Sequence, residues 1–191
     1  MMQKMLRNKN TLQQASRMFS IYNYQSASHQ RVWMEVEKNG QNKGRMVFEL
    51  YDSLSPNLAE NFTSFCTGEA QGHRSYVGTT FGKGWAGHGI YGGAVDGCDK
   101  NLGANNERNV DENLEVRHHK RGVLSLVNDG PHSNGSQFLV TFGEANYLNG
   151  YNNVLGELVQ GESVLSEMES SCARGCGALG DTWKVTAAGR V

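Results

Sequence analysis

Proline and long apolar runs are both scarce in this sequence. Proline occurs only at Pro56 and Pro131, whereas glycine occurs 24 times among 191 residues. Because disordered segments and flexible linkers usually contain both residues, many glycines with few prolines favour a turn-rich β domain over a helical bundle. No apolar run approaches the roughly 20 residues that a membrane-spanning helix needs, so a protein that spans a membrane is not expected.

An excess of one charge is also missing from the chain as a whole. The sequence has 18 basic and 19 acidic residues and a formal net charge of −1. This balance argues against a nucleic-acid binder that relies on bulk charge. Hydrophobic residues make up 38% of the chain, which is enough to bury the core of one globular domain with an appendage.

The charges are unevenly placed along the chain. Residues 1–34 contain five basic side chains and no acidic ones, whereas residues 35–191 carry a net charge of −6. The basic residues of the first part are Lys4, Arg7, Lys9, Arg17 and Arg31. A basic, acid-free segment with scattered apolar residues is typical of a mitochondrial targeting sequence. We therefore divide the chain into an N-terminal extension, residues 1–30, and a domain, residues 31–191.

The extension is expected to be retained and to contact another subunit. A polar arm of this length cannot by itself offset an ordering cost of about 1–2 kcal/mol per residue, so an ordered arm needs a surface to hold it. This interpretation predicts a mitochondrial location and protein partners. A solvated arm on a cytosolic protein is the alternative.

The four cysteines do not predict a disulfide framework in a chain of this length. They are Cys66, Cys98, Cys172 and Cys176. The close pair Cys172 and Cys176 could suggest a metal, but no second close pair of cysteine or histidine residues completes the four ligands of a structural zinc site. We expect free thiols, no metal and no cofactor.

Alternating apolar residues predict β-strands through most of the domain. Residues 44–51 place Met46, Phe48 and Leu50 on one face, and Asn39-Gly40 predicts a hairpin turn that joins them to a strand over residues 32–37. Further strands are predicted over residues 122–127, 137–142, 154–159 and 183–187.

Two helices are expected among these strands. The first begins with Ser55 as the capping residue and Pro56 at the first helical position, and ends at Gly68 in a left-handed conformation. The second is predicted over residues 162–168. Together the elements indicate a mainly β fold, a closed antiparallel β-barrel capped by two α-helices.

A glycine-rich segment over residues 81–97 contains the pattern G-x-G-x-x-G at residues 82–87. This pattern marks a dinucleotide site only where a helix follows, because the helix N-terminus holds the pyrophosphate. The sequence from His88 to Gly93 contains three glycines in six residues and cannot propagate a helix. Nucleotide binding is therefore not expected.

Three motifs occur in an order that resembles the cyclophilins, the barrel-fold peptidyl-prolyl isomerases. They are Gly44-Arg45-x-x-Phe48-Glu49-Leu50, Pro56-x-x-Ala59-Glu60-Asn61-Phe62 and Asn128-x-Gly130-Pro131-x-x-Asn134-Gly135-Ser136-Gln137-Phe138. The resemblance covers residues 31–191 and implies an eight-stranded barrel with a helix at each end. It also implies rotation about X–Pro bonds as the activity, against a barrier of about 18–20 kcal/mol.

The resemblance also implies where a substrate groove lies. In the family an arginine donates to the proline nitrogen, and the matching residue here is Lys83, which keeps the charge but lacks the planar guanidinium fork. Ten further residues match groove positions. They are Phe81, His88, Gly89, Tyr91, Asn128, Gln137, Leu139, Tyr147, Leu148 and Asn152.

Several of these residues depart from the family pattern. His88 replaces a pocket phenylalanine, Gly89 a pocket methionine and Tyr91 a glutamine that holds the substrate backbone. Leu139 replaces a second pocket phenylalanine, and Tyr147 replaces a tryptophan. The changes at His88 and Gly89 remove on the order of 100–200 Å² of apolar contact, or roughly 3–5 kcal/mol. A millimolar ligand is bound by only about 4 kcal/mol. We therefore expect a hollowed proline pocket and lost or weak catalysis.

Two clusters of histidine and basic residues could suggest other chemistry. His88 beside Lys83 could move a proton, but the sequence places no carboxylate to orient the imidazole. The run His118-His119-Lys120-Arg121 is expected to be a solvated loop. The sequence thus favours a structural or binding subunit of a larger mitochondrial assembly. An active peptidyl-prolyl isomerase with an altered pocket remains the alternative.

Overall fold

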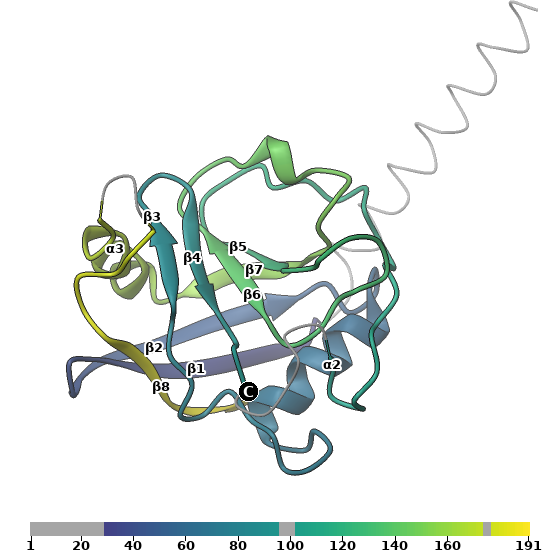
Figure 1. Ribbon diagram of the computed structural model, residues 1–191, viewed down its shortest axis with the longest axis horizontal. Coiled ribbons are helices and arrows are strands. Elements are labelled where there is room, and N and C mark those ends of the chain that lie inside the picture. The colour runs from purple at the N-terminus through teal and green to yellow at the C-terminus, as the bar shows by residue number, and fades with distance from the viewer. Residues whose placement is uncertain (1–28, 96–101, 174–176) are drawn as a thin grey trace, which may run out of the picture.

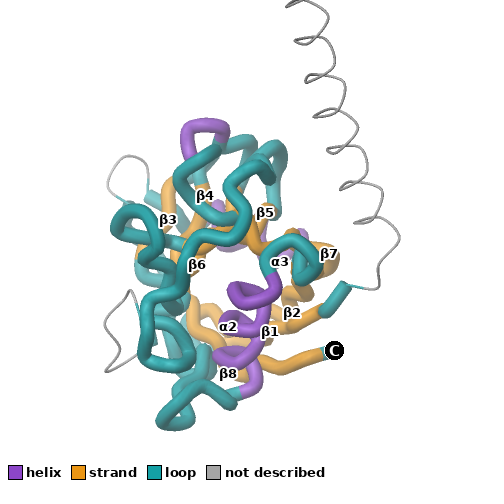
Figure 2. The backbone as a smooth tube through the Cα atoms, turned by 90° about the vertical axis from the view of Figure 1, so that its right-hand side faces the viewer, coloured by secondary structure: helices purple, strands orange, loops and turns teal. Residues whose placement is uncertain are grey.

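The computed structural model describes residues 29–95, 102–173 and 177–191. The predicted extension lies almost wholly outside the described residues, as do Cys98 and Cys176. The described chain forms one curled sheet with helices α2 and α3 at opposite ends of it (Figure 1). In the view turned by 90°, long loops gather around β4 and β6 (Figure 2).

Eight antiparallel strands and two α-helices make up the domain. The strands are β1 (Arg31–Lys38), β2 (Gln41–Leu50), β3 (Lys83–Trp85), β4 (Gly89–Gly92), β5 (Val123–Leu126), β6 (Phe138–Thr141), β7 (Val154–Gln160) and β8 (Trp183–Arg190). The helices are α2 (Pro56–Thr67) and α3 (Glu162–Ser170), with a short 3-10 helix, η1 (Asn146–Leu148), before β7. Neither α-helix in the described ranges has the length and apolar character that crossing a bilayer requires.

The sheet is a curled half-barrel, so the expectation of a closed barrel is corrected. Its strand order is β3-β4-β6-β5-β7-β2-β1-β8, which leaves β3 and β8 as the two edges. The segment that precedes β3 meets β8 through an isolated bridge between Thr80 and Lys184. Three backbone hydrogen bonds join the two there: Gly78 N to Val185 O at 2.8 Å, Val185 N to Thr79 O at 2.9 Å and Phe81 N to Trp183 O at 3.0 Å. Beyond this point Gly84 N donates to Gly177 O instead, so no ladder joins β3 to β8.

The first hairpin follows the sequence pattern. Asn39 and Gly40 both have positive φ angles, 51° and 82°, as a two-residue hairpin turn requires. In β2, Met46, Phe48 and Leu50 are buried as predicted. The strands β3 and β4 were not predicted from periodicity, because their seven residues include three glycines and no alternating pattern.

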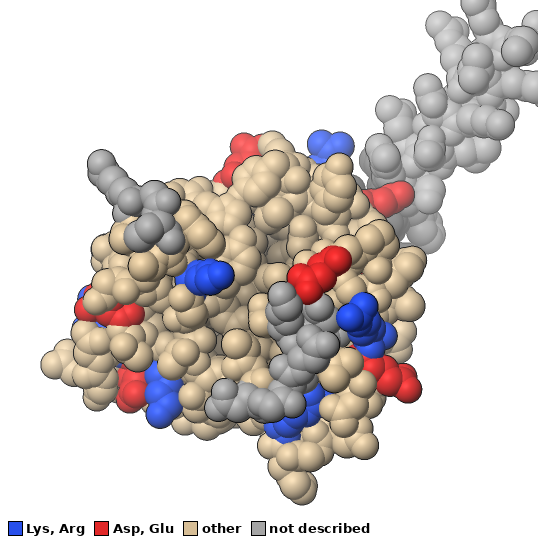
Figure 3. Space-filling view, in the orientation of Figure 1, with Lys and Arg blue, Asp and Glu red and all other residues tan. Residues whose placement is uncertain are grey.

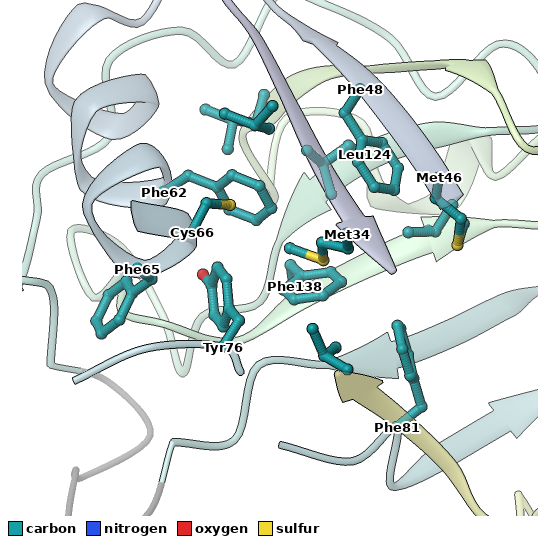
Figure 4. Close-up of a cluster of buried hydrophobic side chains, with 14 of the residues drawn as sticks. Met34, Met46, Phe48, Phe62, Phe65, Cys66, Tyr76, Phe81, Leu124 and Phe138 are labelled. Carbon is teal, nitrogen blue, oxygen red and sulfur yellow. The ribbon is translucent and has the colours of Figure 1, made fainter. Parts of the chain in front are cut away.

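An aromatic cluster fills the space between the sheet and α2. The rings of Phe62, Tyr76 and Phe138 contact one another with centroids 5.1–5.4 Å apart (Figure 4). The Tyr76 hydroxyl donates to Ser136 O at 2.7 Å, so the buried polar atom has a partner. This cluster anchors the segment that leads into β6, and β6 carries part of the predicted groove.

Helix α2 is capped by a residue that the sequence pattern did not identify. Pro56 takes the first helical position and Gly68 ends the helix at φ 77°, both as predicted. Ser55 stands at the capping position, but its side chain makes no capping hydrogen bond and its buried oxygen has no partner among the described residues. Instead the Glu112 carboxylate accepts from Asn57 N at 3.2 Å and from Leu58 N at 2.9 Å. A carboxylate is favoured here because a helix N-terminus carries partial positive charge.

We predict that Glu112→Ala lowers the free energy of unfolding by about 1–2 kcal/mol, because two helix N–H groups lose their acceptor. Ser55→Ala should change it by less than about 0.5 kcal/mol, since the hydroxyl is already unpaired. Urea denaturation at pH 7 measures both, with Glu115→Ala, an exposed neighbour, as the control. A larger loss in Ser55→Ala than in Glu112→Ala would show that the serine caps the helix after all.

Candidate functional site

Three strands bring the predicted site residues to one face of the sheet. In the register, Lys83 of β3 pairs with Tyr91 of β4, and Tyr91 pairs with Leu139 of β6. Directly paired residues share a face, and the neighbouring row, with Ile90 and Val140, points into the core and is fully buried. Lys83, Tyr91 and Leu139 therefore lie side by side on the outer face.

The position of the family's pocket methionine is occupied by a neighbouring side chain. A Cβ placed on Gly89 would lie 2.5 Å from Leu139 Cδ1 and 2.7 Å from the Val140 carbonyl oxygen. Leu139 itself is only 2% exposed. The expected hollow at Gly89 is thus corrected: Leu139 fills that space and lies directly on the glycine backbone.

Aromatic rings line the same face. The His88 ring stacks on the Tyr91 ring at 5.6 Å and on the Tyr147 ring at 5.4 Å, nearly parallel to both. His88 Nε2 lies 2.6 Å from the Tyr91 hydroxyl. Burial lowers the pKa of His88 and raises the pKa of Tyr91, so both side chains are held neutral. The stack replaces the phenylalanine, glutamine and tryptophan positions of the family with one connected unit.

Trp85 is a site residue that the sequence analysis missed. It lies two residues after Lys83 on β3 and therefore on the same face. Its ring meets Tyr91 and His88 edge-on, with centroids 5.6 and 6.0 Å apart. The alternation from Lys83 to Trp85 could have indicated this, had β3 been recognised as a strand.

Two polar side chains on this face are unpaired. Lys83 is exposed, and within residues 29–95, 102–173 and 177–191 its ammonium group has no ion-pair or hydrogen-bond partner. Gln137 precedes Leu139 by two residues, is half-buried, and its side-chain amide likewise makes no hydrogen bond to a described residue. These two groups are free to bind a ligand.

The remaining predicted residues are tied into the scaffold. Phe81 lies in the core, 4% exposed, with its ring edge-on to Phe138. Asn128 Nδ2 donates to Tyr151 O at 2.8 Å, and Asn152 Nδ2 donates to Leu126 O at 2.9 Å. Leu148 is half-buried in η1, beside Tyr147. The structure thus gathers Lys83, His88, Gly89, Tyr91, Gln137, Leu139 and Tyr147, and holds the others around them.

The expected solvated loop at residues 118–121 is wrong for two of its four residues. His118 is fully buried: Nδ1 lies 3.0 Å from Asn149 Oδ1 and Nε2 lies 2.9 Å from Ser125 Oγ. Burial lowers the pKa of His118. Arg121 forms ion pairs with Glu162 and Glu169 of α3. Charge composition misled the prediction, because the partners of both side chains are distant in sequence.

His118 also fixes the turn that carries Tyr147. Its backbone N–H donates to Asn149 Oδ1 at 2.9 Å, and its carbonyl accepts from Ala145 N at 2.9 Å. These bonds grip both ends of the turn that contains η1. The turn in turn presents Tyr147 to His88, so the position of the aromatic stack depends on a buried histidine.

No set of three histidine, cysteine, aspartate or glutamate side chains in the described part of the chain is gathered as a metal site would need. The chemistry that the face itself offers is one ammonium group, one amide, and an aromatic surface. It can bind a polypeptide backbone and one acidic group.

The curled eight-stranded sheet with this groove is the architecture of the cyclophilins, and comparison with known proteins agrees. A family model described as "Cyclophilin type peptidyl-prolyl cis-trans isomerase/CLD" matches residues 33–187. The chain belongs to this family, which confirms the resemblance drawn from the motifs.

Two relatives illustrate the range of this similarity. The chain is 38% identical over 152 residues to "Probable inactive peptidyl-prolyl cis-trans isomerase-like 6" of Bos taurus, covering 74% of this chain and 48% of that protein. It is 35% identical over 139 residues to "Peptidyl-prolyl cis-trans isomerase" of Encephalitozoon cuniculi, covering 72% and 80% respectively. The chain thus spans about half the length of the bovine relative.

We predict that Gly89→Met, which restores the family's pocket residue, lowers the free energy of unfolding by about 1–3 kcal/mol. The added Cβ would overlap Leu139 and the backbone of Val140, so β4 and β6 must separate. Gly82→Met is the matched control, because a Cβ there meets no atom within 4 Å. Thermal unfolding of the two variants tests this, and equal melting temperatures would mean that the pocket at Gly89 is open.

Proposed function

We propose that this cyclophilin-type chain acts by binding protein partners and has little or no isomerase activity. The seating of Leu139 on Gly89 is the observation that carries the proposal. A bound proline ring needs an apolar pocket on this face. The space that the methionine side chain of the family would occupy is taken by Leu139. A millimolar ligand is bound by only about 4 kcal/mol in total, so the loss of roughly 3–5 kcal/mol of apolar contact removes most of the affinity for proline.

The hydrogen-bond donor that the family directs at the proline nitrogen is weakened as well. Lys83 carries a charge at the family's arginine position but has no planar fork that donates to two acceptors at fixed angles. By analogy with the removal of one oxyanion donor, this change adds about 2–4 kcal/mol to the barrier. Weak binding and a weak donor act on the same transition state, so their effects reinforce each other.

The relatives support this proposal unequally. The bovine protein is named as probably inactive, and its similarity covers most of the domain described here. The Encephalitozoon cuniculi protein is named as an isomerase. Catalytic activity is therefore the outcome against which the proposal is tested.

We predict that the purified chain does not accelerate cis/trans isomerisation of a proline tetrapeptide in a chymotrypsin-coupled assay. The uncatalysed reaction takes tens to hundreds of seconds, so even weak catalysis is measurable. Lys83→Ala and Lys83→Arg are assayed beside the wild type. A wild-type rate above the uncatalysed one that disappears in Lys83→Ala would overturn the proposal, and a gain in Lys83→Arg alone would assign the defect to the donor.

We further propose that the chain serves in a larger mitochondrial protein assembly, with residues 1–30 as the segment that directs it there and contacts a partner. The basic, acid-free composition of these residues supports the location. The junction is attached to the domain, since Gln30 Nε2 donates to Thr63 Oγ1 at 2.7 Å and Gln30 N donates to Asp52 at 3.2 Å. The core of the domain is built entirely from later residues, beginning with Val32.

Deletion of residues 1–28 should move a fluorescent fusion out of the mitochondria without unfolding the domain, because the junction contacts of Gln30 are kept. A full-length fusion with Lys4, Arg7, Lys9 and Arg17 changed to glutamine controls for length and should mislocalise in the same way. Identical mitochondrial staining of all three fusions would contradict the targeting role. Migration of the native protein as a free 21.0 kDa monomer would contradict the assembly.

A further inference from the structure

The groove face keeps one unpaired cation after its own contacts are counted. No described carboxylate pairs with Lys83, and the acidic groups of neighbouring elements are engaged elsewhere. Glu169 accepts from Gly87 N at 2.8 Å and pairs with Arg121, and Asp181 lies 2.9 Å from Lys38 Nζ. The ammonium group of Lys83 is therefore available to a carboxylate from outside the chain.

Among the described residues, the side chains next to Lys83 on the outer face are uncharged. Its cross-strand neighbours on the outer face are Tyr91 and Leu139, and Trp85 follows it along β3. In the space-filling view, tan, uncharged residues make up most of the described surface on this side, with scattered basic and acidic groups among them (Figure 3). A single cation on a neutral, partly apolar face selects an anion locally, although residues 35–191 carry a net negative charge.

Exposed tyrosines and an amide could contact an extended peptide segment bound next to Lys83. Tyr147, which is 60% exposed, lies in the turn held by His118, and Tyr151, which is 74% exposed, follows two residues after that turn. Exposed tyrosines supply large contact areas at low conformational cost. Gln137 has a free amide on the same face as Lys83, and such an amide can both donate to and accept from a peptide backbone.

We propose that the groove recognises an extended segment of a partner protein through an acidic side chain at the site where the family takes proline. The carboxylate of a glutamate or aspartate pairs with Lys83, the Gln137 amide binds the adjacent backbone, and a neighbouring apolar or aromatic side chain packs on Tyr147. This inference rests on the proposed binding function and names the chemistry of its partner. A phosphate group is a poorer match, because the face has one lysine and no arginine fork.

The test is an array of heptapeptides, Gly-Ser-X-X-X-Ser-Gly, with each X varied over all residues in turn and probed with the labelled full-length chain. Wild type should select glutamate or aspartate at one X position. Exchange of that residue for glutamine should weaken binding about threefold to tenfold, as expected for one partly solvated ion pair.

Charge reversal at the protein supplies the decisive comparison. Lys83→Glu should exchange the preference for lysine or arginine at the same position, whereas Arg190→Glu, an equal change at an exposed site at the end of β8, should leave it unchanged. Thermal unfolding checks that both variants are folded. No acidic preference in wild type, no binding to any peptide, or a preference that Lys83→Glu retains would each overturn the inference.

The same array separates this inference from the proposed function. Binding without a charge preference would refute recognition of an acidic side chain and leave a protein-binding role standing. Selection of proline together with catalysis in the tetrapeptide assay would refute both. A preference for phosphorylated over acidic residues, on an added phosphoserine row, would also count against a carboxylate ligand.

Discussion

The contact between Leu139 and the bare backbone of Gly89 constrains the whole groove. A side chain on one strand can lie this close to its neighbour only where the neighbour has no Cβ, so β4 and β6 are locked in their spacing by a glycine. Leu139 then occupies the floor, and the rings of His88, Tyr91 and Tyr147 stack beside it. The space next to Gly89 is therefore occupied by Leu139, and a larger residue at position 89 would have to displace it.

The sequence predicted the elements whose signal is local. Period-two alternation located β1 and β2, and the Asn39-Gly40 turn set their pairing, because a hairpin is specified by residues that are adjacent in the chain. Two strands, β3 and β4, carry no such signal, because their seven residues include three glycines. They are fixed by tertiary pairing, since β4 pairs with β6 and β3 pairs with β4. Closure of the barrel was wrongly expected for the same reason, since only tertiary structure decides that Gly84 binds Gly177 rather than β8.

The groove was predictable in its residues but not in its shape. Motif order placed Lys83, His88 and Tyr91 on the site, and the structure brings them together. Glycine in place of methionine at position 89 suggested a hollow. The side chain that fills this space belongs to Leu139, which is 50 residues away in the sequence. His118 was misread likewise, since a histidine in a basic run looks solvated until Asn149 and Ser125 meet it. Long-range partners decide burial, and a single sequence does not display them.

Side-chain hydrogen bonds of Asp111 hold the loop that follows β5 in place. Asp111 accepts from Asn134 Nδ2 at 2.8 Å and Asn153 Nδ2 at 2.6 Å, which binds the loop containing Asn134 to the strand end at Asn153. Asn134 belongs to the third family motif, and its side chain is hydrogen-bonded within the domain. A buried polar group that lost its partner would destabilise the domain, so Asn134 has a structural role here. Lys83 and Gln137 differ, because neither side chain has a partner in the described fold, and both remain available to the ligand that we propose.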